Sequence, residues 1–99
     1  MKPNLAVVID HLRPFVGDFA EDFTAMTLSL VNRRYVNIEP GYRRLIVTFT
    51  HGIPDLEEDE LLLFLEILSE SLERVVGAHQ RDKIMVRIKA ELVKHFVSS

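Results

Sequence analysis

The clearest alternation of hydrophobic and polar positions lies between residues 55 and 76. Apolar side chains recur there at intervals of three and four, which places them on one face of an α-helix. They are Leu61, Leu65, Leu68, Leu72 and Val76. Asp55 is a favourable N-cap residue, and Glu58 follows it at the spacing of a capping box. With Gly77 suited to the C-terminal end, the pattern predicts a helix over residues 55–76.

Two further segments, residues 14–35 and residues 81–97, also have helical periodicity. Their apolar faces consist of Phe15, Phe19, Phe23, Met26 and Leu30 in the first and Ile84, Ile88, Leu92 and Phe96 in the second. Upstream, Asn4 can cap a short helix over residues 5–12. Pro14 then kinks or restarts the chain, because proline lacks the amide that a helix interior requires.

Residues 42–51 are ambiguous. Their apolar positions have helical spacing, and Pro40 suits a first helical turn. Residues 45–50, however, are rich in β-branched and aromatic side chains, which is typical of a strand. A single strand among helices would have no pairing partner, so we favour a helix. The predicted fold class is therefore all-α, a compact bundle of four to five helices in one domain over residues 1–99.

Apolar residues also occupy the far sides of the helices predicted over residues 55–76 and 81–97. The dimer interface predicted from them consists of Leu63, Ile67, Val86, Ala90, Val93 and Val97. Scattered exposed apolar residues are normal, but a whole second line on a helix indicates a partner. A second copy in a two-fold arrangement is the simplest partner. The alternative is that the last helix lies centrally in the bundle with both of its lines buried.

Composition narrows the class of protein. With 47% hydrophobic and 27% charged residues, the chain has the composition of a folded domain. A net charge of −3 excludes a positive electrostatic potential over the whole molecule, which is what attracts nucleic acid to a strongly basic protein. The absence of cysteine excludes disulfides and thiolate chemistry, and it fits a reducing compartment. The apolar runs are too short for a signal peptide or for a bilayer span of about 20 residues, so we expect a cytoplasmic protein without membrane association.

Candidate chemistry is limited to two groups of arginines and tyrosines on either side of Pro40. They are Arg33, Arg34 and Tyr35, and Tyr42, Arg43 and Arg44. Guanidinium groups bind phosphates and carboxylates, so these residues are candidates for contact with an anion or a partner; the alternative interpretation is two solvated helix ends. The acidic run 55–60 suits the cap and first turn of a helix and lacks the pattern of a calcium loop. No catalytic residue, metal site or cofactor is predicted, because no motif for a nucleophile, a phosphate or a dinucleotide occurs.

The acidic first turn followed by leucines in residues 55–65, together with the order of helices, resembles a known family. These are the small all-helical N-terminal domains of bacterial stress-response regulators of the RsbU and RsbR types. The resemblance covers most of the chain, implies a domain that dimerises and docks protein partners, and carries over no site residue. We therefore favour a non-catalytic homodimeric domain for protein interaction or for sensing and regulation. The alternative is a small nucleic-acid-associated regulator that uses the arginine groups, although nucleic acid is the less favoured partner.

Overall fold

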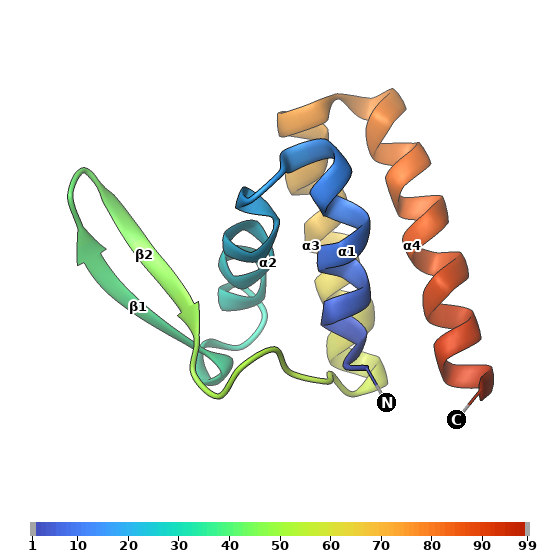
Figure 1. Cartoon of the computed structure of the whole chain (residues 1–99), viewed down its shortest axis with the longest axis horizontal. Coiled ribbons are helices and arrows are strands. Elements are labelled where there is room, and N and C mark those ends of the chain that lie inside the picture. The colour runs from blue at the N-terminus through green and yellow to red at the C-terminus, as the bar shows by residue number, and fades with distance from the viewer. Residues whose placement is uncertain (1, 99) are drawn as a thin grey trace.

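The computed structural model describes residues 2–98, and side chains as far as Phe96. Within that range the elements are α1 (Asn4–Val16), α2 (Phe19–Ser29), the 3-10 turn η1 (Arg33–Tyr35), β1 (Val36–Gly41), β2 (Arg44–Phe49), α3 (Glu58–Val76) and α4 (Ala78–Ser98). Helix α1 contacts α2 and α4, and α3 contacts the same two helices, so the helices form a ring around one core (Figure 1). The two strands form a hairpin that projects beside α2.

Helices α3 and α4 confirm the periodicity of their sequences. The buried positions of α3 include Leu61, Leu65, Leu68 and Leu72, and those of α4 include Ile84, Ile88 and Leu92. Gly77 separates the two helices with φ 85°, a conformation that glycine adopts without strain. The opposite side of α4 is exposed at Val86 and Val93, so α4 packs through one side only. The alternative in which α4 lies centrally in the bundle is therefore wrong.

The helix predicted over residues 14–35 is wrong, because the chain breaks at Gly17, where φ is 61°. The helix expected to end at residue 12 instead continues through the exposed Pro14 to Val16. The buried side of α2 agrees only in part with the predicted face, of which Phe23 is buried. The buried side also includes Thr24 and Thr27, whose hydroxyl groups donate to the carbonyls of Ala20 and Phe23 at 2.8 and 2.9 Å. Because these bonds satisfy the hydroxyls, polar residues enter the core, and apolar residues of the predicted face stay outside. The exposed ones are Phe19, Met26 and Leu30.

The prediction of a helix over residues 42–51 is also wrong, and the fold is therefore mostly helical rather than all-α. Strand β2 pairs with β1 in antiparallel register, with Val36 opposite Phe49 and Ile38 opposite Val47. The partner that the strand needed lies directly upstream, where apolar and polar residues alternate. Val36 and Val47 are buried against the helices, so this face of the hairpin belongs to the core.

Neither of the two residues predicted to cap helices acts as predicted. The side chain of Asp55 accepts a hydrogen bond from the backbone N–H of Asn4 at 2.8 Å, so it caps α1 rather than α3. Helix α3 begins instead after Glu57. The buried Asn4 side chain donates to the carbonyl of Leu56 at 2.8 Å and accepts from its N–H at 2.9 Å. This Asn4–Leu56 clasp fastens the segment before α3 to the start of α1.

Candidate functional site

The predicted dimer residues lie largely on the surface. Along α4, Val86 and Val93 are 68% and 61% exposed, and Ala90 between them is exposed as well. On the neighbouring α3, Leu63 is 45% exposed and Ile67 is half-buried. The side chain of Val97 lies outside the described residues. Leu63 and Ile67 lie on the flank of α3 that carries Glu60 and Ser71 toward η1 and α2, whereas Ser69 and Glu73 on the other flank contact Arg81 of α4. The two α3 residues therefore do not join the α4 residues in one surface, and we call Val86, Ala90 and Val93 the α4 outer face.

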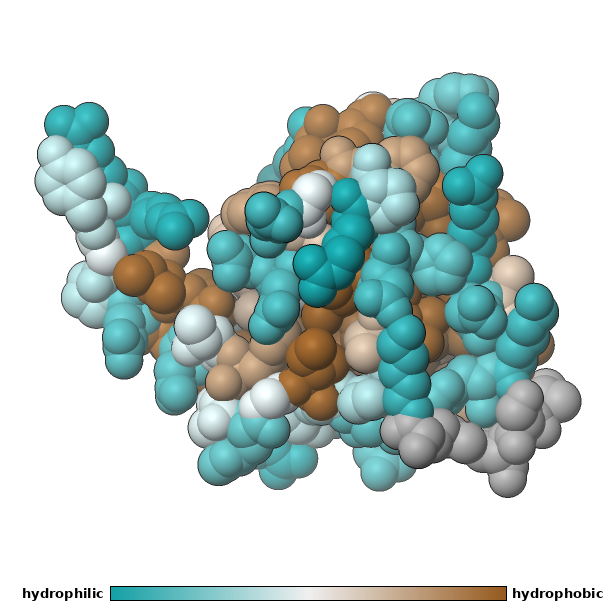
Figure 2. Space-filling view, viewed as in Figure 1, coloured by the Kyte–Doolittle hydropathy of each residue, from teal (hydrophilic) through white to brown (hydrophobic). Residues whose placement is uncertain are grey.

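A second apolar surface, which sequence reasoning missed, is concave. Helix α2 and strand β2 border a groove with a volume of about 740 Å³, within the usual range of ligand pockets. Its exposed apolar residues are Phe19, Met26, Leu30, Leu45 and Ile46. Figure 2 shows the hairpin standing away from the helices, with an open notch between its tip and the body. We call this surface the α2–β2 groove.

The charges around the α2–β2 groove are segregated. Asp22 lines it from α2 and Arg44 lines it from β2. Residues 18–30 carry three acidic side chains and no basic one: Asp18, Glu21 and Asp22. The turn of the hairpin is basic, with Arg43 lying over the ring of Tyr42 at 5.0 Å and Arg44 next to it. Among the described side chains, no ion pair engages these acidic residues or these arginines.

The structure does not bring the two arginine groups together. Arg33, Arg34 and Tyr35 form η1 at the base of the hairpin, whereas the other group, residues 42–44, forms its tip. The six residues of β1 separate them, which is about 20 Å at the rise of a strand. One small anion therefore cannot contact both groups at once.

The group at the base of the hairpin is already engaged with α3. The Tyr35 hydroxyl donates to Glu60 Oε1 at 2.6 Å, and the Asn32 amide donates to Glu60 Oε2 at 3.1 Å. Arg34 lies over the Tyr35 ring at 5.3 Å. The hydrogen bonds from Tyr35 and Asn32, with the nearby Arg34 charge, lower the pKa of Glu60 below its ordinary value of 4.5. This arrangement ties the hairpin base to the first turn of α3.

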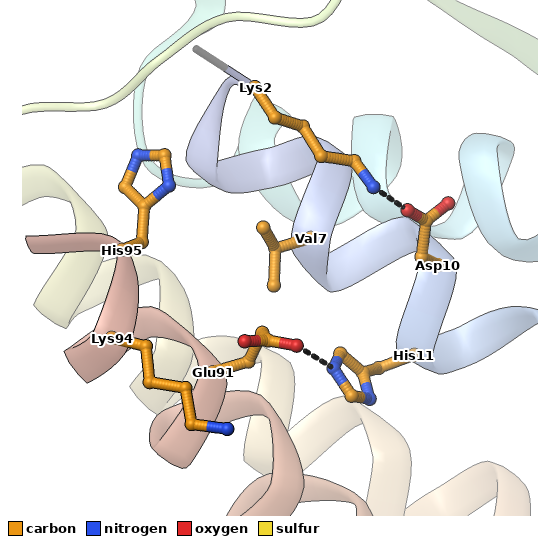
Figure 3. A pocket seen from close by; sticks show the side chains of 7 residues that line it. All are labelled: Lys2, Val7, Asp10, His11, Glu91, Lys94 and His95. Carbon is orange, nitrogen blue, oxygen red and sulfur yellow. Dashed lines mark hydrogen bonds and ion pairs between the residues drawn. The ribbon is translucent and has the colours of Figure 1, made fainter. Parts of the chain in front are cut away.

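Two of the histidines, 84 positions apart in the sequence, line one pocket of about 380 Å³ between α1 and α4 (Figure 3). His11 Nε2 lies 4.0 Å from Glu91 Oε1, and His95 Nε2 lies 3.9 Å from Asp55 Oδ1. On the α1 side of the pocket, Lys2 forms an ion pair with Asp10. Each of these two histidines thus lies near one carboxylate, His11 across the contact of α1 with α4 and His95 across the contact of α4 with the segment before α3. The part of the chain that the structure describes holds no group of three or more side chains placed to bind a metal ion.

Comparisons of this chain with protein-family models, curated proteins and solved structures found no match. Across the described residues, no helix has both the length and the apolar character needed to cross a bilayer. The features that remain for a functional interpretation are the α4 outer face and the α2–β2 groove.

Proposed function

We propose that this chain is a non-catalytic protein-interaction or regulatory domain that forms a homodimer through the α4 outer face. The observation that carries the proposal is that α4 has two apolar sides and packs through only one of them. Ile84, Ile88 and Leu92 are buried, while Val86 and Val93 stay in water. A helix that only closed the bundle would need no apolar residues on its outer side.

The energetics are compatible with a dimer of modest affinity. Full burial of one such side chain contributes roughly 1.5–3 kcal/mol. A two-fold interface buries each side chain twice, once from each copy. The association itself costs an estimated 4–15 kcal/mol in lost translational and rotational freedom. Burial of Val86 and Val93 in both copies therefore offsets the lower and middle values of that cost.

The regulatory role and the compartment belong to the same proposal. The resemblance to the N-terminal domains of stress-response regulators supports a domain that dimerises and presents a surface to protein partners. The absence of cysteine supports a reducing compartment, and we propose the cytoplasm.

Sedimentation equilibrium across a concentration series tests the dimer. The Val93→Glu variant is expected to stay folded and to sediment as a monomer, because position 93 is exposed and the carboxylate meets water. Asn37→Glu on the exposed side of β1 is the matched control, since it adds the same charge away from α4, and it is expected to leave the dimer intact. A wild-type chain that is monomeric at all concentrations would contradict the proposal, as would a Val93→Glu variant that associates like the wild type.

A further inference from the structure

We infer that the distal half of the hairpin, residues 39–46, is a strap that closes on α2 of its own chain, and that the open α2–β2 groove is one of its two positions. Closure brings the basic turn of the hairpin to the acidic start of α2, and it covers the apolar side chains between the two walls. This inference goes beyond the proposed function, because it involves no second copy and no residue of the α4 outer face.

The hairpin is fixed at its base and free beyond it. At the base, Val47 is buried against the helices, and the N–H of Thr50 donates to the carbonyl of Tyr35 at 2.9 Å. In the strap, Leu45 and Tyr42 are 63% and 85% exposed. A two-stranded ribbon twists more strongly than a wide sheet and is marginally stable without packing. The strap can therefore bend toward the helices while the base stays in place.

The strap already turns an apolar side toward α2. Side chains alternate between the two faces of a strand, so Leu45 lies on the same face of β2 as the buried Val47. On the opposite wall of the groove, Phe19 and Met26 of α2 are exposed as well. Approach of the two walls, without rotation of the strand, brings these side chains together. Closure thus removes apolar surface from water on both walls.

The charges of the two walls are opposite and lie at the same end of the groove. Because η1 joins the end of α2 to the base of the hairpin, the turn of the hairpin lies toward the start of α2 (Figure 1). Asp18 and Asp22 are one helical turn apart there, and Arg43 and Arg44 follow the turn of the hairpin. Among the described side chains, no ion pair engages any of these four. Their attraction favours closure and fixes the register in which the strap meets α2.

Closure controls access to the groove. In the open position, the groove has a volume of about 740 Å³. In the closed position, residues of the same chain cover its apolar wall. A ligand that binds only the open position must therefore shift the equilibrium away from the closed one, so the strap acts as an autoinhibitory device.

The test measures a distance within one molecule by pulsed electron paramagnetic resonance. Spin labels are attached to Tyr42→Cys at the turn and to Arg13→Cys on α1, which lies beyond α2 as seen from the hairpin (Figure 1). The chain has no cysteine of its own, so these two positions carry the only labels. Dilution with unlabelled chain confines the measured distances to single molecules.

The charge variants are made in this labelled parent. We expect the parent to populate a shorter distance than the variant with Asp22→Lys, in which the α2 wall repels the strap. The ratio of short to long distances should fall at least tenfold in Asp22→Lys, because a like-charge contact replaces an attraction. Addition of Arg44→Glu to Asp22→Lys restores opposite charges and should recover the short distance.

Glu39→Lys is the matched control, because it makes the same change of charge on the outer face of β1, opposite Ile46. It is expected to leave the distances of the parent unchanged, and circular dichroism verifies that each variant is folded. The inference is wrong if Asp22→Lys has the distances of its parent, or if the addition of Arg44→Glu does not restore them. An equal effect of Glu39→Lys would also overturn it. Sedimentation of Val93→Glu tests the proposed function separately, since position 93 lies outside the groove.

Discussion

The helical bundle and the hairpin are stabilised very differently. The bundle holds fully buried side chains from α1, α2, α3 and α4, among them Leu12, Leu28, Phe64 and Ile88. In the hairpin, the buried apolar residues are Val36 and Val47, both toward the base. The bundle therefore has a core that stabilises it without a partner, whereas the distal half of the hairpin relies on its turn and on the pairing of two strands. We therefore expect mutations in the bundle to change the stability of the protein more than mutations in the hairpin do.

The largest expected effect is in the bundle. Phe64→Ala removes a fully buried ring and should lower the free energy of unfolding by about 3–5 kcal/mol, through lost burial and the cavity left behind. Denaturant titration measures this change. Val47→Ala in the hairpin is the counterpart, and it should increase hydrogen exchange in β1 and β2 while the helices keep their protection. A Val47→Ala variant that unfolds the bundle would show that the two regions form one cooperative unit.

The next effect concerns the Asn4–Leu56 clasp, which fastens the segment between the hairpin and α3 to the start of α1. Asn4→Ala leaves the buried N–H and carbonyl of Leu56 without their partner, so we expect a loss of about 3 kcal/mol in the free energy of unfolding. Asp55→Ala removes the cap of α1 and should cost about 1 kcal/mol. Amide exchange after Asp55→Ala should increase in the first turn of α1; an increase confined to α3 would contradict the assignment of the cap.

A smaller, pH-dependent effect is expected at the base of the hairpin. Tyr35→Phe removes the strongest hydrogen bond to Glu60 and should cost about 1 kcal/mol at neutral pH, since both groups are partly exposed. The pKa of Glu60 is lower in the folded chain than in the unfolded one, so its contribution is present above about pH 4.5 and is lost as pH falls through the folded-state pKa. Thermal unfolding from pH 7 to pH 3 should show the two proteins converging. Tyr42→Phe at the exposed tip is the control, and it should match the wild type at every pH.

The smallest effect is at the turn of the hairpin. Arg43 has φ 65°, a left-handed conformation that costs a non-glycine residue energy. Arg43→Gly removes this strain but adds flexibility to the unfolded chain, so we expect a net gain of about 0.5 kcal/mol in the free energy of unfolding. Chemical denaturation at a concentration that keeps the protein monomeric measures it. A loss of stability would mean that the stacking of Arg43 on Tyr42 outweighs the strain.

Sequence reasoning succeeded where local pattern decides structure. The buried sides of α3 and α4 follow from residues three and four apart, and Gly77 marks the break between them. The same reasoning placed Val86 and Val93 on the opposite side of α4, where they are exposed. The pattern also identified Arg34 and Arg43 as candidates but gave no measure of the distance that β1 puts between them.

The predictions from sequence failed where the structure depends on a hydrogen-bond partner or on a residue far away in the sequence. Thr24 and Thr27 enter the core because backbone carbonyls satisfy their hydroxyls, which a hydrophobic pattern does not register. Strand β2 needed a partner, and the alternation in residues 36–39 was the available signal for it. The clasp joins residues 52 positions apart, a separation at which sequence periodicity carries no information.

The adjacency of α1 and α4 has a consequence for protein engineering. Figure 1 places the beginning of α1 and the end of α4 at the same end of the molecule, and Lys2 lines the same pocket as Lys94 and His95. A short flexible linker from residue 98 to residue 2 can therefore close the chain, and new termini can be opened in the turn at residues 42–43. Such a circular permutant would keep every contact between helices, while β1 and β2 would no longer be joined by a turn. The chain would then connect α4 to α1 through the linker, and the hairpin would no longer connect α2 to α3.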